Sequence, residues 1–422
     1  MKRTTHKNYG YTSFVYSSIV AFFVFCTVSI EAKIIEVCSQ CELKTVKSAI
    51  AIAKIGDEIV LKKGTYLEHD IEVSKSLTIR GEEGTIIDGE NAGTILTIMA
   101  DNVLISNLTF VNVGRSYTQD FAGILIKNSK NYAIKNNILK NVFFGIKIER
   151  SDHGILSGNS VSSESVSESG SGNGIHAWHS SDIRVENNDL HNMRDGIYFE
   201  FIDNSIVVNN VSHNNIRYGL HFMFSNNNSY ENNNFYENGA GVAVMFSKFT
   251  MMKNNIFRNN WGTASYGLLL KEIYDADIIN NNFTKNTVAI NIEGSTRVNY
   301  FDNTFQENGW AIKVAGACYK NIYKKNNFFG NAMDVSYHSK INDNEFEGNY
   351  WSSYTGYDLN RDGIGDVPFR PVKLFSYIVN KHPEAIVLLR SLFVDLIDFS
   401  EKVSPIFTPE HVVDNKPAMR EY

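Results

Sequence analysis

A short repeat constrains this chain more than any other feature. A Gly or Ala followed by alternating apolar residues returns about every 22 residues: GILIKNS at 123, GIKIERS at 145, GIHAWHS at 174, GIYFEFI at 196, GLHFMFS at 219, GVAVMFS at 241, GLLLKEI at 267, AINIEGS at 289 and AIKVAGA at 311. The unit is too short for a strand-helix-strand crossover, and its apolar period is two rather than 3.6. We therefore predict an all-β fold, a single-stranded right-handed parallel β-helix with three short strands in each coil.

Asn clusters recur at a similar offset in the units, among them Asn136/Asn137, Asn187/Asn188, Asn254/Asn255 and Asn326/Asn327. Stacked Asn side chains can form hydrogen bonds along the turns and so satisfy polar groups inside a column of coils. We expect these residues to be structural.

The chain is expected to divide into five parts. Residues 1–32 resemble a signal peptide, with Lys2, Arg3 and Lys7 before an apolar run, although an uncleaved anchor helix is the alternative. Residues 33–122 are predicted to form an N-terminal cap and the first coils, 123–347 the regular coils, 348–372 a closing loop, and 373–422 a C-terminal helix and docking tail. The tail beyond Pro405 has little hydrophobic periodicity with which to fold alone, so the C-terminal segment is expected to dock on a membrane permease, and a helix that plugs the open end of the column is the alternative. The apolar stretch at 385–399 is too short and too charged to cross a bilayer, so no transmembrane segment is expected in the mature protein.

The charge balance bears on possible partners. The chain has 40 Lys+Arg against 46 Asp+Glu and no basic stripe, so nucleic acid is not an expected partner.

The expected export bears on the cysteines. In an oxidising compartment such as the periplasm, Cys38 and Cys41 are expected to form a local disulfide, with a pair of metal ligands as the alternative. Cys318 is expected to be buried in a strand.

Alternation along each strand places the third and fifth residues of a repeat on the outer surface. The outward residues of consecutive coils then include His176, Glu200, His221, Met223 and Met245. Imidazole and thioether together suit copper, because Met prefers Cu(I) and His accepts either oxidation state. The sequence thus predicts a copper-handling surface, and a partner-binding stripe without metal is the alternative.

A second constellation lies in the closing loop. Asp358, Asn360, Asp362 and Asp366 follow the spacing of the first nine positions of a calcium loop, but the twelfth position is Phe369 rather than Glu. The pattern indicates either a calcium site or a purely structural turn.

Paired carboxylates for acid-base catalysis are scarce on the outward face, where Glu149 and Glu200 are expected to lie two coils apart. We therefore expect a protein that is not an enzyme. The alternative is a carbohydrate-binding or carbohydrate-modifying β-helix of the lyase or epimerase type.

Several long motifs resemble the NosD family of periplasmic maturation proteins of nitrous oxide reductase. They are RYGLHFMFS, NGAGVAVMFS, YGLLLKEIYD and above all GYDLNRDGIGDVPFRPVKLFS, followed by LLRSLFVDLID and KPAMR. The resemblance is densest from about residue 174 onward. It implies a periplasmic β-helical subunit of an ABC transporter, with a permease, an ATPase, a copper chaperone and nitrous oxide reductase as partners, and a place in denitrification. The pair Cys38/Cys41 lies outside these motifs.

Overall fold

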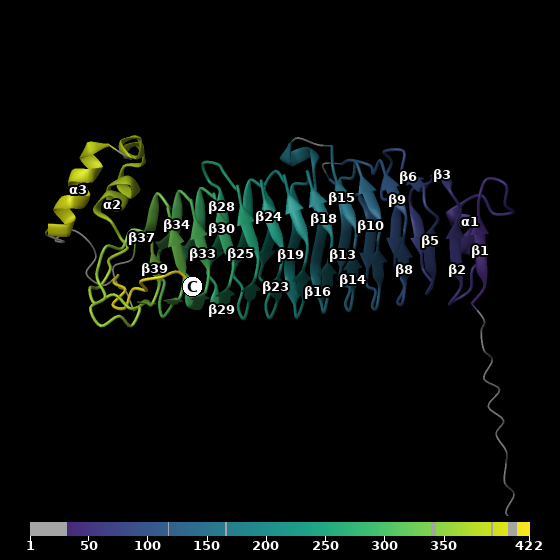
Figure 1. Cartoon of the computed structure of the whole chain (residues 1–422). Helices are drawn as coiled ribbons and strands as arrows, with labels where there is room; N and C mark the ends of the chain where they lie inside the picture. Colours follow the sequence, from purple (N-terminus) through teal and green to yellow (C-terminus); the bar gives the residue numbers. More distant parts are fainter. Residues whose placement is uncertain (1–31, 117, 165–166, 339–342, 390, 404–411) are drawn as a thin grey trace, which may run out of the picture. The chain divides into compact units, whose positions relative to one another are not determined.

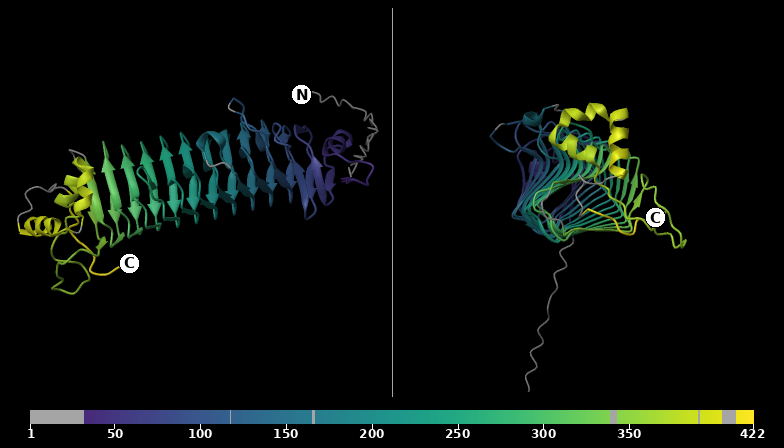
Figure 2. Two further views of the ribbon diagram at one scale, coloured as in Figure 1. Left: turned by 90° about the horizontal axis from the view of Figure 1, so that it is seen from above. Right: turned by 90° about the vertical axis from the view of Figure 1, so that its left-hand side faces the viewer.

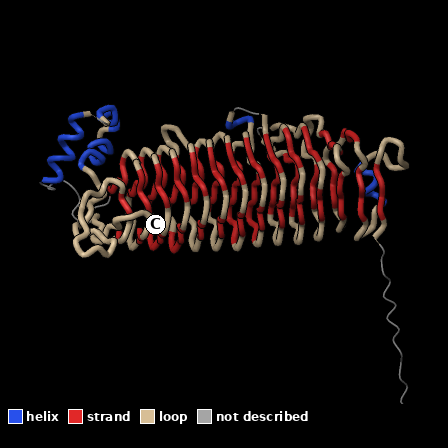
Figure 3. Tube along the Cα trace, viewed as in Figure 1, coloured by secondary structure: helices blue, strands red, loops and turns tan. Residues whose placement is uncertain are grey.

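Three short strands in each coil wind the chain into three parallel sheets, here named A, B and C (Figures 1 and 3). The structure is a computed structural model, and it describes residues 32–116, 118–164, 167–338, 343–389, 391–403 and 412–422. Residues 33–422 form one unit. The predicted signal peptide lies outside the described residues, apart from Ala32. The parallel β-helix predicted from the repeat is confirmed.

Each regular coil passes through sheets C, A and B in that order. Sheet A contains β1 (Ile34–Val37), β2 (Glu58–Leu61), β5 (Thr78–Gly81), β8 (Leu104–Ser106), β11 (Ala133–Lys135), β14 (Ile155–Ser157), β17 (Arg184–Glu186), β20 (Ile206–Val208), β23 (Ser229–Glu231), β26 (Met251–Lys253), β29 (Tyr274–Ile279), β32 (Thr296–Phe301), β35 (Ile322–Lys324) and β38 (Glu345–Glu347). Sheet B contains β3 (Gly64–Leu67), β6 (Thr85–Asp88), β9 (Thr109–Val111), β12 (Ile138–Lys140), β15 (Ser160–Ser162), β18 (Asp189–His191), β21 (Val211–His213), β24 (Asn234–Tyr236), β27 (Ile256–Arg258), β30 (Asn282–Thr284), β33 (Thr304–Gln306), β36 (Asn327–Phe329) and β39 (Tyr350–Trp351). Sheet C contains β4 (Ile71–Val73), β7 (Leu96–Ile98), β10 (Ala122–Lys127), β13 (Phe144–Glu149), β16 (Ile175–Ser181), β19 (Asp195–Asp203), β22 (Tyr218–Met223), β25 (Ala240–Met245), β28 (Tyr266–Lys271), β31 (Val288–Glu293), β34 (Trp310–Ala315) and β37 (Met333–His338).

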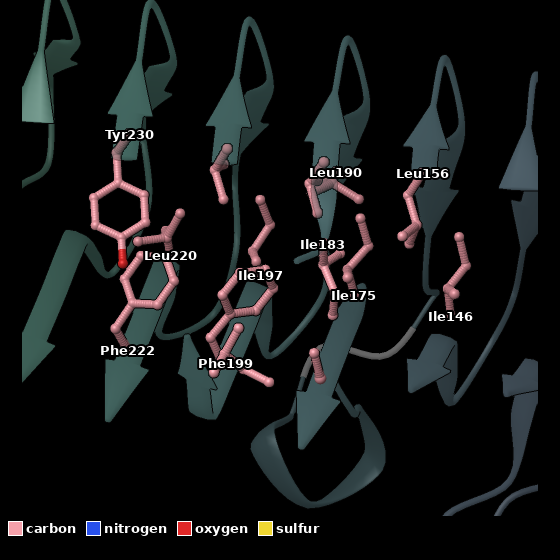
Figure 4. Close-up of a cluster of buried hydrophobic side chains, with 14 of the residues drawn as sticks. Ile146, Leu156, Ile175, Ile183, Leu190, Ile197, Phe199, Leu220, Phe222 and Tyr230 are labelled. Carbon is pink, nitrogen blue, oxygen red and sulfur yellow. The ribbon is translucent and has the colours of Figure 1, made fainter. Parts of the chain in front are cut away.

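The core is a set of apolar stacks that run along the column. Ile146, Ile175, Ile197 and Leu220 pair in register across four strands of sheet C, and all four side chains are buried (Figure 4). These are second residues of the repeat, so the inward phase predicted from alternation is confirmed. Each coil buries its apolar residues against the coils on either side, which is why a single unit would not fold alone.

Asn side chains form a ladder at the turn from sheet A to sheet B. In most Asn pairs the first residue has a positive φ, such as 55° at Asn232, and the second residue is buried, as is Asn233. At Asn326/Asn327 the positive φ is at Lys325, and Asn326 is the buried ladder residue. Asn adopts this backbone conformation at a lower cost than most residues. The Oδ1 atom of Asn233 accepts the backbone N–H of Asn210 at 2.9 Å, and its Nδ2 donates to the Val207 carbonyl at 2.9 Å. The structural role predicted for these residues is confirmed.

A short helix lies within the predicted N-terminal cap and covers the first coil. Helix α1 (Val46–Ile52) begins after Thr45, whose side chain accepts a hydrogen bond from the backbone N–H of Ser48. Its buried residues are Val46, Ala49 and Ile50. Beside the helix, Cys38 and Cys41 are joined by a disulfide, and Cys318 is a buried free cysteine.

The predicted C-terminal helix is broken into three segments, α2 (Leu374–Lys381), η2 (Pro383–Leu388) and α3 (Leu392–Val403). Pro383 explains the first break, because proline has no backbone N–H to donate and disfavours helical backbone at the residue before it. The helical segments lie at the C-terminal end of the column, to one side (Figure 2). Phe375 and Val379 of α2 pack with sheet C residues at the starts of β31, β34 and β37, namely Val288, Trp310 and Met333.

The end of the column is closed by the last described segment rather than by these helices. Val412, Phe369 and Trp351 belong to the main core, and Asp414 is fully buried. The Asp414 carboxylate accepts the backbone N–H of Asn349 at 2.9 Å and its Nδ2–H at 3.0 Å, so it supplies the last rung of the Asn ladder. The tail beyond Pro405 has too little hydrophobic periodicity to fold alone. Residues 412–422 instead pack on the last coil, because the ladder gives Asp414 buried donors to pair with.

A one-turn helix, η1 (Glu168–Gly170), lies between β15 and β16, within a Ser- and Gly-rich insertion at 162–173. None of the helices in the described ranges is long and apolar enough to cross a membrane.

Candidate functional site

The five residues predicted to handle copper lie on the outer face of sheet C, on four consecutive strands, β16, β19, β22 and β25. The register places Tyr198 between His176 and His221, and it places Met223 between Glu200 and Met245. We call His176, Glu200, His221, Met223 and Met245 the sheet C stripe. The strand phase predicted for these residues is therefore correct.

His176 lies at the N-terminal edge of the stripe. Its ring centroid is 4.8 Å from that of Tyr198, and the Tyr198 ring is 5.0 Å from that of His221. Burial, with a smaller contribution from the Lys147 ammonium, lowers the pKa of His176 to about 4. The ring is therefore neutral at pH 7. Its Nδ1 accepts a hydrogen bond from Asn173 Nδ2 at 3.0 Å, because Arg194 donates to the Oδ1 of the same amide at 3.2 Å. Because Tyr198 intervenes, His176 lies about 10 Å from His221, too far for both rings to bind one ion at about 2 Å.

His221 lies beside a buried ion pair. Asp195 is fully buried, and Arg217 donates two hydrogen bonds to its carboxylate at 2.9 and 2.6 Å. Burial acts to raise the pKa of Asp195, but the contacts with His221 and Arg217 outweigh it, and the pKa lies below its ordinary value. The Nδ1 atom of His221 is 3.9 Å from this carboxylate. Among the described residues, neither ring nitrogen of His221 has a hydrogen-bond partner.

The two methionines occupy neighbouring coils. Met223 and Met245 pair in register, and both side chains are half-buried. The Tyr198 hydroxyl points at Met223 Sδ from 3.8 Å. His221 and Met223 are two residues apart on one strand, so both project from the same face. The structure thus brings His221, Met223 and Met245 together with Glu200 and leaves His176 apart.

Asp195 and Arg217 are site residues that the repeat pattern missed. Asp195 is the first residue of β19, and Arg217 directly precedes β22. Both positions lie before the Gly that opens the repeat unit, where the alignment assigned no side-chain direction. Their opposite charges one coil apart, at 195 and 217, are the signal in the sequence that pairs them.

The loop predicted to bind calcium is an exposed turn that its own acidic side chains hold together. Asp358 accepts the backbone N–H groups of Asp362 and Gly363 at 3.2 and 2.9 Å, and Asn360 Oδ1 accepts the N–H of Asp362 at 3.2 Å. Asp366 accepts the N–H of Leu359 at 2.7 Å. The side-chain oxygens of Asp358 and Asn360 thus converge on one side of the turn. Phe369, at the twelfth position, packs into the core instead.

The helical segments expose an apolar surface. The exposed fractions are 82% for Val387, 74% for Leu392, 56% for Leu396 and 66% for Phe399, whereas Val394 faces inward and is 8% exposed. An apolar patch of this kind is typical of a contact surface for another protein.

Two solved structures with TM-scores above 0.5 share the fold. A family 28 exopolygalacturonase from Yersinia enterocolitica aligns with a TM-score of 0.59 and 12% identity, over 76% of this chain and 78% of that one. The A-module of the mannuronan C-5 epimerase AlgE6 from Azotobacter vinelandii aligns with a TM-score of 0.51 and 13% identity, over 72% of this chain and 93% of that one. At such identities the likeness concerns the fold alone.

Sequence relatives are more specific. Residues 65–190 match the model of a right handed β-helix region, and residues 157–356 match the family model described as periplasmic copper-binding protein (NosD). A probable ABC transporter binding protein NosD from Pseudomonas aeruginosa is 27% identical over 379 residues, which cover 85% of this chain and 87% of the relative. The corresponding protein from Stutzerimonas stutzeri is 26% identical over 380 residues, 85% of this chain and 86% of the relative. Together these matches support a protein of the NosD family, whose model is described as periplasmic copper-binding protein.

Proposed function

We propose that this chain is a periplasmic, non-catalytic subunit of an ABC transporter and that it handles copper for the maturation of nitrous oxide reductase. The family description supports the compartment and the metal, and the names of the two relatives support the transporter. In this proposal the copper ion is a cargo and not a resident cofactor. A copper chaperone and nitrous oxide reductase are the proposed partners in its transfer.

The observation that carries the proposal is the arrangement of His221, Met223 and Met245. One imidazole and two thioethers lie on neighbouring strands, and they match the soft ligands that Cu(I) prefers. The nitrogens of His221 give up no hydrogen bond to a described residue when they bind an ion. Glu200 borders the same group and would add an anionic oxygen.

A double variant tests the site. Replacing His221 and Met223 with Ala is expected to weaken Cu(I) binding by at least about 10-fold, equivalent to about 1.4 kcal/mol, in an anaerobic competition with a coloured chelator. The matched control replaces His179 and Met251, which are exposed and lie outside the stripe. Unchanged affinity in the double variant would remove the site, and equal losses in both variants would indicate non-specific binding.

We also propose that the exposed face of η2 and α3 contacts the permease. Its apolar side chains include Leu392 and Phe399, and the segments themselves are anchored on the column through Val394 and α2. Replacing Leu392 and Phe399 with Ser is expected to abolish co-purification with the transporter while the melting temperature stays unchanged. A control variant with Ser at Phe249, an exposed residue of the column, should co-purify normally. Normal co-purification of the first variant would exclude this face.

The absence of catalysis is part of the proposal. Glu149 and Glu200 are separated by Trp178 in the register, and the Glu149 carboxylate pairs with Lys147 at 2.8 Å. A pair of carboxylates this far apart, with one neutralised by an ammonium, does not favour glycosidic chemistry. A glycan-binding screen separates the alternatives, because glycan binding without copper uptake would favour the carbohydrate function.

Calcium is proposed for the closing loop. The spacing of Asp358, Asn360, Asp362 and Asp366 supports it, and so does the convergence of the Asp358 and Asn360 oxygens on one side of the turn.

A further inference from the structure

We propose that Asp189, His191 and His213 form a second metal site, on sheet B, for a divalent transition-metal ion of the zinc or copper(II) class. The ligand atoms of these three side chains all lie within 4.8 Å of one another. The site is separate from the sheet C stripe in position and in ligand chemistry.

The strand register builds the group. Asp189 and His191 are two residues apart on β18, so both project from the outer face of sheet B. His213 on β21 pairs directly with His191, and Val211 takes the place beside Asp189. One carboxylate and two imidazoles therefore occupy three corners of a square on the sheet.

His213 is held in the orientation of a metal ligand. Asn214 Nδ2 donates to Glu237 at 3.2 Å, which leaves its Oδ1 to face His213 Nδ1 at 2.6 Å. The Nδ1 atom therefore carries the proton, and Nε2 points at Asp189 Oδ1 from 3.2 Å. The Nε2 lone pair and the Asp189 oxygen thus face the same point, as two ligands of one metal ion do. A ring N–H that donates to a neighbouring amide oxygen in this way is usual for metal-binding His.

His191 supplies the third donor. Its Nδ1 atom is buried and has no hydrogen-bond partner among the described residues, with Asp189 Oδ1 at 3.8 Å. The His191 and His213 rings are nearly parallel, with centroids 5.0 Å apart, and Tyr236 stacks on the other side of His213 at 4.7 Å. The Arg258 guanidinium lies 4.4 Å from the Tyr236 ring and supports it from the next coil. The column thus fixes two of the ligands before any ion binds.

The donor set selects the metal class. Two imidazole nitrogens with one carboxylate oxygen suit Zn(II) or Cu(II), whereas calcium prefers oxygen ligands and Cu(I) prefers sulfur. Ligand atoms on one such ion lie at most about 4 Å apart, so a side-chain adjustment of about 1 Å closes the group. The side chains are 49%, 27% and 19% exposed for Asp189, His191 and His213, which leaves an open side for water or for an incoming ligand.

Zinc titration of the metal-free mature protein tests the site, because Zn(II) has no redox chemistry. Calorimetry at pH 7.5 is expected to show one equivalent bound at this site. His191→Ala and His213→Ala should each weaken Zn(II) binding by at least about 10-fold, and the melting temperature that zinc raises in the parent should no longer rise in either variant. The Cu(II) form should show two nitrogen ligands by electron paramagnetic resonance.

The control is a variant with Ala at His176 and His221, which should keep its Zn(II) affinity even where its Cu(I) affinity falls. The two sets of variants thereby test the sheet B site and the sheet C stripe separately. Absence of zinc binding, together with a doubly protonated His213 in nitrogen NMR spectra, would show an ion pair only and overturn the proposal. Zinc binding that survives both single substitutions would overturn it as well.

Discussion

Replacing Asn233 with Ala tests how much one rung of the Asn ladder stabilises the column. Its Oδ1 accepts the backbone N–H of Asn210 at 2.9 Å, and its Nδ2 donates to the Val207 carbonyl at 2.9 Å and to Asn255 Oδ1 at 3.0 Å. In the variant the buried N–H of Asn210 has no acceptor, and the Val207 carbonyl loses a donor. An unsatisfied buried group costs about 1–3 kcal/mol, so the expected loss is about 3 kcal/mol.

Hydrogen exchange at Asn210, read together with urea unfolding, measures this loss. A repeat column need not unfold in two states, so the local readout carries more weight than the midpoint. The matched control is Asn232→Gly, since Asn232 has a φ of 55° that glycine adopts freely, and it should change stability by less than about 0.5 kcal/mol. Unchanged protection of the Asn210 amide in the Ala variant would refute the reasoning.

Three further predictions concern the loop, the stripe and the column end. If Asp358 and Asp362 bind calcium, chelation should lower the melting temperature relative to excess calcium, because an ion that binds only the native state stabilises it; identical melting curves would leave only a turn. Burial lowers the pKa of His176 to about 4, so below pH 6.5 the unfolded chain binds a proton that the folded ring does not, and stability falls as the pH falls toward 4. His176→Gln should therefore flatten the decline in melting temperature between pH 7 and pH 5, and equal slopes in the two proteins would contradict this. Asp414→Ala leaves buried donors on Asn349 and Trp351 without acceptors and should speed hydrogen exchange in β38 and β39, whereas replacing the exposed Glu421 should not.

The repeat predicts well on which face of the strand a side chain lies, but it predicts poorly how far neighbouring side chains bury it. Alternation along GLHFMFS correctly places His221 and Met223 on the outer face. It does not predict that His221 is only 6% exposed, because the cover comes from the rings of Tyr198 and Tyr218, at 5.0 and 4.8 Å. Stacking of large side chains from adjacent coils determines this burial, so the sequence of one strand does not predict it.

The sheet B site could have been found from the sequence by the same phase argument. DLH at 189 and VSH at 211 recur with the 22-residue spacing of the repeat, and both His residues hold the third position of a strand. The part that sequence could not supply is the contact of His213 with Asn214 and Glu237, which depends on side-chain torsions at a turn. The packing of residues 412–422 on the last coil could not be predicted from the sequence for a related reason. Its anchor is a single buried carboxylate, Asp414, and a polar anchor leaves no apolar pattern.

The position of Asp414 in the chain also bears on the order of folding. Coils can wind successively from the N-terminal end, since each edge offers backbone groups with which the next strand pairs. The edge at Asn349 is completed only by a residue 65 positions later. Until that residue arrives, the growing end presents unpaired N–H groups, and an open edge of this kind accepts strands from other molecules. Asp414 therefore completes the edge late in folding, and a chain that stops before it is expected to form an aggregation-prone intermediate.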